Sequence, residues 1–212
     1  MLENRFINEL LLKIGANRNI IKVPVLIDSQ ATIDNCFPNV LEKIKRDGGS
    51  IIYGWTIHTF PYIYEAEKHA VWKSENNELI DITPKKIPYN QILFVPDNDN
   101  TWNYTGEYID NIRINITTNS VVDDYIILNE TISKLFQIGK RNLNGELMVT
   151  KQINNAIEIL QRWKTEHEKF MYSNGTIDSL CYCCKNKPYK LCIGLKLRGE
   201  MQFILDNIRQ KA

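Results

Sequence analysis

The fold is decided by residues 51–83, which read IIYGWTIHTFPYIYEAEKHAVWKSENNELIDIT. Residues 51–57 are rich in β-branched and aromatic side chains, and residues 66–73 show an alternating pattern. The polar turn at residues 75–78 leads into a third apolar run at residues 79–83. Such runs, separated by polar turns, predict antiparallel strands. We therefore expect an antiparallel sheet at the centre of the fold.

A helix is expected to precede these strands and to begin at Cys36. Residues 36–46 read CFPNVLEKIKR, and Pro38 falls in the first turn, where proline is tolerated. Residues 47–49, DGG, end the helix, because glycine commonly follows a helix C-terminus. The sequence therefore predicts a cysteine at the N-terminus of a helix that packs against the sheet.

Cys36, His69 and Asp81 follow one another in the order of a thiol nucleophile, its base and a carboxylate that orients the base. A helix N-terminus favours the thiolate, and an imidazole beside it can take up a proton and later deliver it to a leaving group. His69 and Asp81 belong to expected neighbouring strands, so they can face each other. Gln30, on the loop before Cys36, is the expected side-chain donor to an oxyanion, together with the Cys36 backbone N–H.

Residues 30–84 resemble the core of transglutaminase-like and papain-like cysteine enzymes. The resemblance rests on a cysteine before a helix, on HAVW at residues 69–72 and on DITP at residues 81–84, and the transglutaminase-like pattern matches best. Val71 departs from that pattern, because it separates Ala70 from Trp72. The resemblance implies a helix that opens with Cys36 and packs on a sheet carrying His69 and Asp81.

Each member of this constellation also has a purely structural interpretation. Cys36 could be a small buried apolar side chain, which is a common fate of a single cysteine. His69 could be a strand histidine bonded to a backbone carbonyl, and Asp81 could cap the turn before Pro84. His58 is a competing base, but no aspartate follows it at a comparable spacing.

Two tryptophans are candidates for a substrate-binding cleft next to the thiol. Trp55 lies on the first expected strand and Trp72 on the second. Clefts that bind ligands are commonly lined by aromatic side chains. The alternative is that both tryptophans belong to the core.

Four of the five cysteines lie within residues 181–192, CYCCKNKPYKLC. This crowding suits metal ligation better than a disulfide framework. Cys-x-Cys followed after eight residues by another cysteine resembles the SEC-C zinc motif, which implies a structural Zn²⁺. The implied ligands are Cys181, Cys183 and Cys192.

The fourth metal ligand is left open by the sequence. In the SEC-C motif it directly follows the last cysteine, and Ile193 occupies that place here. Cys184 could take the role, or a residue from elsewhere such as His167, which otherwise packs on its helix. The alternative is a degenerate remnant that holds free thiols.

The chain is expected to be α+β, with an antiparallel sheet packed on the Cys36 helix and a small C-terminal helical zinc knuckle. We expect residues 1–150 to form the transglutaminase/papain-like domain and residues 151–212 to form a helix followed by the SEC-C-like segment. The remaining elements are expected at residues 2–14, 20–27, 91–95, 112–116, 124–136, 151–171 and 199–210.

The composition and net charge of the chain limit the kinds of molecule that it is expected to bind. The chain has 212 residues, 43% of them apolar, and a formal net charge of +1. This balance supports a real core and gives no support to nucleic-acid binding through a broad basic face. The apolar runs are shorter than the about 20 residues that span a bilayer, so no membrane association is expected. The cysteine usage suits a reducing cytoplasm.

Two functions follow as hypotheses. The first is a cysteine-dependent hydrolase or acyl transferase of the peptidase, amidase, deamidase or transglutaminase type, which acts on an amide bond of a protein or peptide. The second is an inactive protein-binding module, of the kind that a phage or mobile element could encode, whose zinc knuckle docks a protein partner. Chemical labelling of Cys36 separates the two hypotheses.

Overall fold

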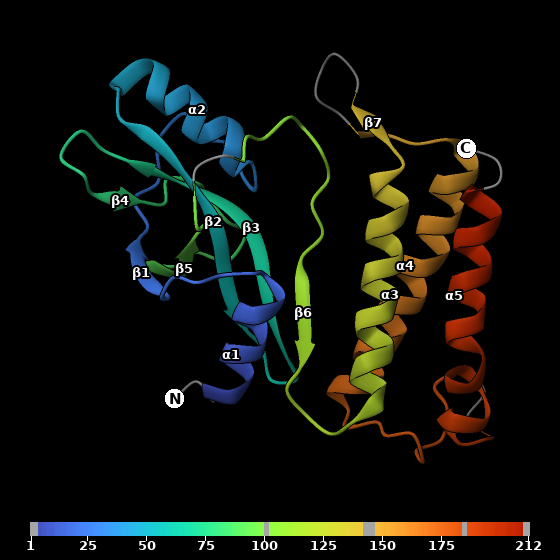
Figure 1. The fold of residues 1–212 in the computed structure, drawn as a ribbon. Coiled ribbons are helices and arrows are strands. Elements are labelled where there is room, and N and C mark those ends of the chain that lie inside the picture. Colours follow the sequence, from blue (N-terminus) through green and yellow to red (C-terminus); the bar gives the residue numbers. More distant parts are fainter. Residues whose placement is uncertain (1–3, 100–101, 142–146, 184–185, 210–212) are drawn as a thin grey trace. The chain divides into compact units, whose positions relative to one another are not determined.

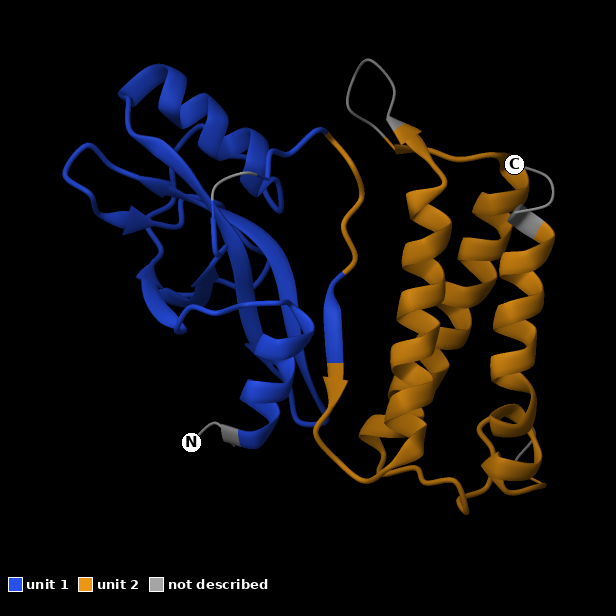
Figure 2. Cartoon of the chain, viewed as in Figure 1, with its two compact units in different colours: residues 1–105, 111–113 blue, residues 106–110, 114–212 orange. Residues whose placement is uncertain are grey.

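The computed structural model describes residues 4–99, 102–141, 147–183 and 186–209. The chain divides into two compact units, residues 1–105 with 111–113 (unit 1) and residues 106–110 with 114–212 (unit 2), which Figure 2 distinguishes by colour. This division falls earlier than the predicted boundary at residue 150. The reason is that α3 (Ser120–Gln137) packs with the two C-terminal helices, α4 (Lys151–Tyr172) and α5 (Ile193–Arg209).

Unit 1 is built around an antiparallel sheet with the strand order β1-β5-β2-β3-β4, and β6 pairs with β3. The α+β class and the antiparallel sheet predicted from the sequence are thereby confirmed. The strands are β1 (Ile21–Pro24), β2 (Ser50–Thr59), β3 (Ile63–Lys73), β4 (Leu79–Ile80), β5 (Gln91–Pro96) and β6 (Ile112–Asn115).

The two ends of this strand order meet, so the sheet is nearly closed. Asp81, which follows β4, forms a parallel bridge with Val25, which follows β1. The Asp81 N–H donates to the Pro24 carbonyl at 2.9 Å, and the Leu26 N–H donates to the Asp81 carbonyl at 2.9 Å. The chain after β4 is therefore held by β1.

Helix α2 (Cys36–Asp47) covers one face of the sheet, as Figure 1 shows, and α1 (Asn4–Lys13) contacts β3. Val40 of α2 is fully buried against Ala70 and its neighbours, whereas Val71 belongs to a separate apolar cluster with Phe94. Side chains of a strand alternate between faces. His69 therefore shares the face of Val71, and its ring lies 6.5 Å from that of Phe94 between centroids.

Two consecutive glycines turn the chain from α2 into β2. Gly48 and Gly49 have φ angles of +71° and +82°, and the Gly48 N–H donates to the Ile44 carbonyl at 3.0 Å. A Cβ on Gly49 would lie 2.3 Å from the Lys73 carbonyl oxygen and 2.8 Å from Nε1 of Trp72. The predicted helix end is confirmed, and Gly49 is required there because β3 passes so close.

Unit 2 contains α3, α4 and α5 side by side (Figure 1). Asn119 and Thr150 cap the first two helices, since their side chains accept hydrogen bonds from the N–H groups of Val121 and Ile153. A short hairpin, β7 (Lys140–Arg141) with β8 (Leu147–Met148), precedes α4. The buried side chains that form the core of this unit are Leu128, Ile132, Leu135, Ile153, Ile157, Leu160, Leu197, Met201 and Leu205.

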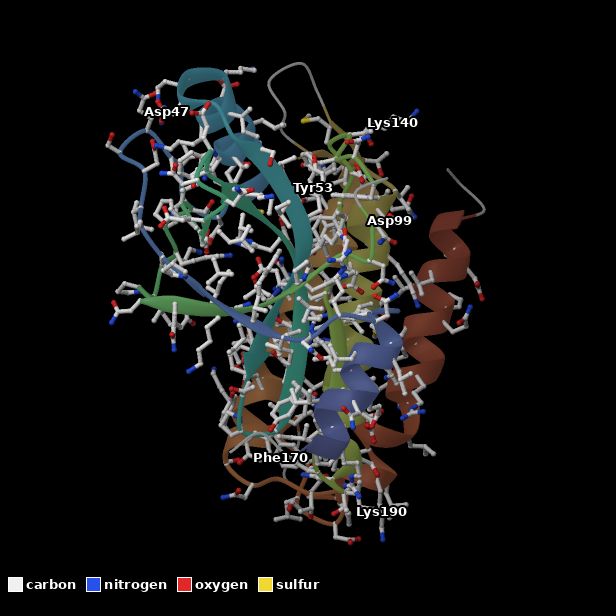
Figure 3. The ribbon with its side chains drawn as sticks, turned by 60° about the vertical axis from the view of Figure 1, so that its left-hand side comes forward. Asp47, Tyr53, Asp99, Lys140, Phe170 and Lys190 are labelled. Carbon is white, nitrogen blue, oxygen red and sulfur yellow. The ribbon has the colours of Figure 1, made fainter. Side chains whose placement is uncertain are left out.

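Helix α5 begins at Ile193, earlier than the predicted start near residue 199. Directly before it, a 3₁₀ turn, η1 (Tyr189–Leu191), brings Cys192 to the start of the helix. Phe170 and Lys190 are both labelled in Figure 3, and Lys190 belongs to η1, two residues before Cys192. The ring of Phe170 stacks on that of Tyr189, with centroids 5.4 Å apart.

Candidate functional site

Cys36 is the first residue of α2, as predicted, and its side chain is buried with 8% exposure. Asn35 occupies the N-cap position without a side-chain cap bond, and Asp34 before it has a φ angle of +55°. The Asn39 N–H donates to the Asn35 carbonyl at 3.1 Å and closes the first turn. Cys36 therefore lies at the positive end of the helix dipole.

The structure brings His69 and Asp81 together. Pairing of β3 with β4 ends at Trp72 and Ile80, and Asp81 makes its backbone hydrogen bonds with the chain around β1 instead. His69 Nε2 and Asp81 Oδ2 lie 3.2 Å apart, and the two side chains are 0% and 1% exposed. That distance is short enough for an ion pair, although the two atoms do not align as a hydrogen bond.

The electrostatics of His69 link it to both partners. Burial alone would lower the pKa of His69, but the negative charge of Cys36 and side-chain contacts with Asp81 and Cys36 outweigh burial and raise the pKa to about 10. His69 therefore carries a proton at neutral pH. Cys36, His69 and Asp81 form one electrostatic cluster, which we call the triad cluster.

A second layer of hydrogen bonds holds Asp81 and connects it to α2. Asp81 Oδ1 accepts from the Thr83 N–H at 3.0 Å, and Asn39 Nδ2 donates to Thr83 Oγ1 at 3.3 Å. Asn39 also fixes the loop before the helix, because it donates to the Thr32 carbonyl at 2.7 Å and accepts from the Thr32 N–H at 2.9 Å. Asn39 is buried with 8% exposure, so these bonds are shielded from water.

Polar atoms that lack a hydrogen-bond partner gather at this place. Among the described residues, they are Oγ1 of Thr56, both ring nitrogens of His69 and Oδ2 of Asp81, all of them buried. Thr56 is paired with Glu67 across β2 and β3, and it shares the sheet face of His69. Buried polar groups usually find partners. Two of these atoms, Nε2 of His69 and Oδ2 of Asp81, face each other at 3.2 Å, so the ion pair accounts for them.

Gln30 does not join the triad cluster. Its Oε1 accepts a hydrogen bond from Arg46 at 2.6 Å, near the last turn of α2. With a rise of about 1.5 Å per residue, Arg46 lies about 15 Å along the helix from Cys36. The loop before Cys36 runs back along α2, so Gln30 is at the far end of the helix and its side chain is already engaged.

The two predicted cleft tryptophans have different surroundings. Trp55 lines a cavity of about 250 Å³ together with Lys68, Asp97 and Trp102, and Lys68 Nζ lies 4.9 Å from the centre of the Trp55 ring. Trp72 packs under α2, and its Nε1 donates to the Gly48 carbonyl at 3.0 Å. Trp72 is thus a partly buried packing residue at the C-terminal end of α2, while the cavity at Trp55 is lined by none of the triad residues and is not the predicted cleft next to the thiol.

Sequence reasoning missed a charged group beside the triad cluster. Nε2 of His58 donates to Oε2 of Glu67 at 2.9 Å, and Nζ of Lys85 lies 3.1 Å from Oε1 of Glu67. Burial alone would raise the pKa of Glu67, but the His58 hydrogen bond and the charge of Lys85 lower it to about 2, with a contribution from the charge of His69. The sequence did contain a signal for Glu67. It lies two residues before His69 on the same expected strand, so the two side chains point to the same face of the sheet.

The C-terminal cysteines form a cluster in unit 2 that could hold a metal ion. Sγ atoms of Cys181 and Cys183 are 3.4 Å apart, and those of Cys183 and Cys192 are 3.2 Å apart. All three sulfur atoms lie within 4.8 Å of one another, and no disulfide joins them. The predicted ligands Cys181, Cys183 and Cys192 are therefore brought together, whereas Cys184 lies outside the described residues.

The local fold explains why these cysteines converge. The Cys181 N–H donates to the Lys187 carbonyl at 2.8 Å, and Leu180 forms an antiparallel bridge with Pro188. Burial alone would raise the pKa of the Cys181 thiol, but backbone N–H groups of Cys183 and Ile193 and the neighbouring thiols lower it. Because thiolates bind metals, this environment favours ligation.

His167 is not part of the cysteine cluster. Its Nε2 donates to the Val121 carbonyl at 2.7 Å, and its Nδ1 faces the Tyr182 hydroxyl at 3.5 Å. Burial lowers the pKa of His167, and the backbone hydrogen bond opposes that effect. His167 is fully buried among aromatic rings, which agrees with the packing role that the sequence offered as the alternative.

Comparison of the chain with models of protein families, with curated proteins and with solved structures found no match. Within the described part of the chain, no helix combines the length and the apolar character needed to cross a membrane.

Proposed function

We propose that this chain is a cysteine-dependent hydrolase or acyl transferase that acts on an amide bond of a protein or peptide. The observation that carries the proposal is the placement of His69 in contact with Asp81 while it feels the charge of Cys36 at the start of α2. A thiolate, an imidazolium and an orienting carboxylate are the groups that thiol-dependent acyl transfer requires.

In the proposed reaction, the Cys36 thiolate attacks the carbonyl carbon and the π electrons move onto the oxygen. The Cys36 backbone N–H, at the N-terminus of α2, is the expected donor to this oxyanion. As the carbon–nitrogen bond breaks, His69 gives its proton to the departing amine, which leaves a thioester on Cys36. His69 then takes a proton from water or from an acceptor amine, which attacks the thioester and releases the thiolate.

The test is the rate of iodoacetamide alkylation of Cys36, measured against pH by peptide mass spectrometry. We expect Cys36 to react at pH 6 at least ten times faster than glutathione, since the proton resides on His69 and not on the sulfur. The His69→Asn variant is expected to lose this advantage while its circular dichroism stays unchanged. Equal rates in the two proteins would remove the basis of the proposal.

A second candidate is an inactive binding module, and the low exposure of the triad cluster favours it. Cys36 is only 8% exposed and His69 is fully buried, which limits access for a substrate. A Cys36 that alkylates slowly at pH 6 and independently of His69 would support this alternative. In that case the same cluster serves to stabilise unit 1.

We further propose that Cys181, Cys183 and Cys192 bind a structural Zn²⁺. Three thiolates at short mutual distances suit zinc, which prefers tetrahedral sulfur and nitrogen ligands. Metal content measured by plasma mass spectrometry is expected to be about one zinc per chain. A Cys183→Ser variant is expected to lose the metal, whereas Cys36→Ser is expected to retain it.

A further inference from the structure

Lys85 is anchored next to the start of α2 by the segment that follows Asp81. The carbonyl of Pro84 accepts a hydrogen bond from the Asp34 N–H at 3.1 Å, and Asp34 stands two residues before Cys36. The side chain of Lys85 is only 15% exposed. Its ammonium group is therefore held against unit 1 rather than extended into water.

Glu67 holds the Lys85 ammonium on the side of the sheet that carries His69. Nζ of Lys85 lies 3.1 Å from Oε1 and 3.4 Å from Oε2 of Glu67. Glu67 and His69 are two residues apart on β3, so their side chains leave the same face of the sheet. One ion pair thus connects the chain after Asp81 with the strand that carries the base.

The ionisable groups around Lys85 come from several elements. Burial alone would lower the pKa of Lys85, but the charge of Glu67, the hydrogen bond with it, and the charges of Cys36 and Asp34 raise the pKa. A positive charge held close to a thiol favours its thiolate form. The groups that face Lys85 and the thiol are Asp34, Cys36, His58, Glu67, His69 and Asp81.

We propose that Lys85 is a positioning residue for the thiol, whose ammonium is held by Glu67 next to the start of α2 and stabilises the thiolate of Cys36. This inference deepens the proposed function and rests on it. His69 supplies the proton acceptor, while Lys85 supplies a second positive charge that never gives up its proton during the reaction.

The experiment compares pH profiles of Cys36 alkylation by iodoacetamide in the full-length protein. In Lys85→Met, we expect the midpoint of the profile to move up by about one pH unit, so that the rate at pH values below the wild-type midpoint falls about tenfold. Lys85→Arg keeps the charge and is expected to stay close to the wild type. Lys86→Met is the matched control, because Lys86 is the neighbouring lysine and is exposed.

The Glu67→Gln variant tests the direction in which the midpoint of the alkylation profile moves. It removes a negative charge next to the ammonium, so the midpoint is expected to move down, opposite to Lys85→Met. A purely structural role of the Lys85–Glu67 ion pair predicts the same direction for both variants, because either change breaks the pair. Opposite shifts therefore separate electrostatic positioning from loss of structure.

The outcomes distinguish this inference from the proposed function. Superimposed profiles for Lys85→Met, Lys86→Met and wild type overturn the role of Lys85, even when His69→Asn shows that the thiolate–imidazolium pair exists. If His69→Asn leaves the profile unchanged while Lys85→Met shifts it, the proposed function fails and the action of Lys85 on the thiol stands. A Cys36 that does not react at any pH overturns both.

Discussion

At the residue scale, Gly48 and Gly49 have similar φ angles but different surroundings. Both have positive φ angles, which L side chains rarely adopt. A Cβ on Gly48 would meet the flexible side chain of Glu75, whereas a Cβ on Gly49 would meet the Lys73 backbone and the Trp72 ring. The Lys73 backbone and the Trp72 ring cannot move away from such a Cβ without disturbing β3.

We therefore expect Gly49→Ala to cost more stability than Gly48→Ala. The positive φ angle costs each variant about 1 kcal/mol, and the clash with β3 adds about 1–3 kcal/mol for Gly49 alone. Urea denaturation of the two variants measures the difference in the free energy of unfolding. Equal losses would show that β3 relaxes away from Gly49 at no cost.

Glu67 makes the stability of unit 1 depend on pH. Its pKa is about 2 in the folded chain, below the usual value of 4.5, so its contribution is present above pH 4.5 and is lost as the pH falls toward 2. The contribution is at most about 3.5 kcal/mol, because one pKa unit corresponds to about 1.4 kcal/mol.

In urea titrations between pH 7 and pH 3, wild type is expected to lose stability faster than Glu67→Gln as the pH falls, since glutamine does not titrate. The two curves should converge at the acid end of the range. Parallel curves would contradict the lowered pKa of Glu67. The sign of the effect is fixed, because a lowered carboxyl pKa always stabilises the fold above it.

Some residues of the candidate site were predictable and others were not. Cys36 could be placed because Pro38 and the glycines bound its helix, and His69 and Asp81 because strand alternation relates them across a short turn. Gln30 could not be placed, because the direction of the loop before α2 depends on bonds between Thr32 and Asn39. Side-chain hydrogen bonds of this kind leave no periodic pattern in the sequence from which they could be predicted.

At the scale of elements, the position of α2 depends on Asn39. This buried amide bonds to the backbone of Thr32 on both sides and to the Thr83 hydroxyl, so it joins α2 to the loop before it and to the Asp81 turn. Removing one partner from such a network leaves buried groups unsatisfied. Asn35, by contrast, is exposed and makes no side-chain cap bond.

Asn39→Ala is expected to destabilise unit 1 by about 2–4 kcal/mol, because the Thr32 backbone groups lose their partners. Asn35→Ala is the matched control and should cost less than about 0.5 kcal/mol, as a surface substitution does. Thermal denaturation followed by near-ultraviolet circular dichroism compares the two. A small effect of Asn39→Ala would mean that water replaces the amide.

The observed bounds of helices and strands agree with the predicted ones where a local sequence signal marks the boundary. Strand β3 begins at Ile63, before the predicted start at residue 66, because its pairing with β2 continues as far as Tyr64 opposite Thr59. Helix α5 begins early because it follows directly on η1 and the last cysteine. Both differences arise from tertiary pairing, which local propensity does not encode.

At the scale of the whole molecule, the two compact units have separate cores, and each carries one candidate site. The triad cluster belongs to unit 1 and the cysteine cluster to unit 2. An apolar cluster joins α3, α4 and α5, whereas the cysteine cluster lies in the segment between α4 and α5 and at the start of α5. Metal binding is therefore expected to stabilise unit 2 alone.

Removal of metal by a chelator under reducing conditions should raise amide hydrogen exchange in peptides that cover residues 177–192 and the start of α5. Peptides from the sheet of unit 1 should exchange as before, because no metal ligand lies there among the described residues. Cys183→Ser is expected to reproduce the effect without chelator. Increased exchange across both units would show that their stabilities are coupled.

The bridge between Val25 and Asp81 has a consequence for solution behaviour. A sheet edge with free N–H and C=O groups is a template on which another chain can add a strand. Here the chain after β1 and the chain after β4 satisfy each other, so neither end of the strand order offers such a template at this point. The same contact that positions the carboxylate of Asp81 is thus expected to hinder the addition of another strand at this point.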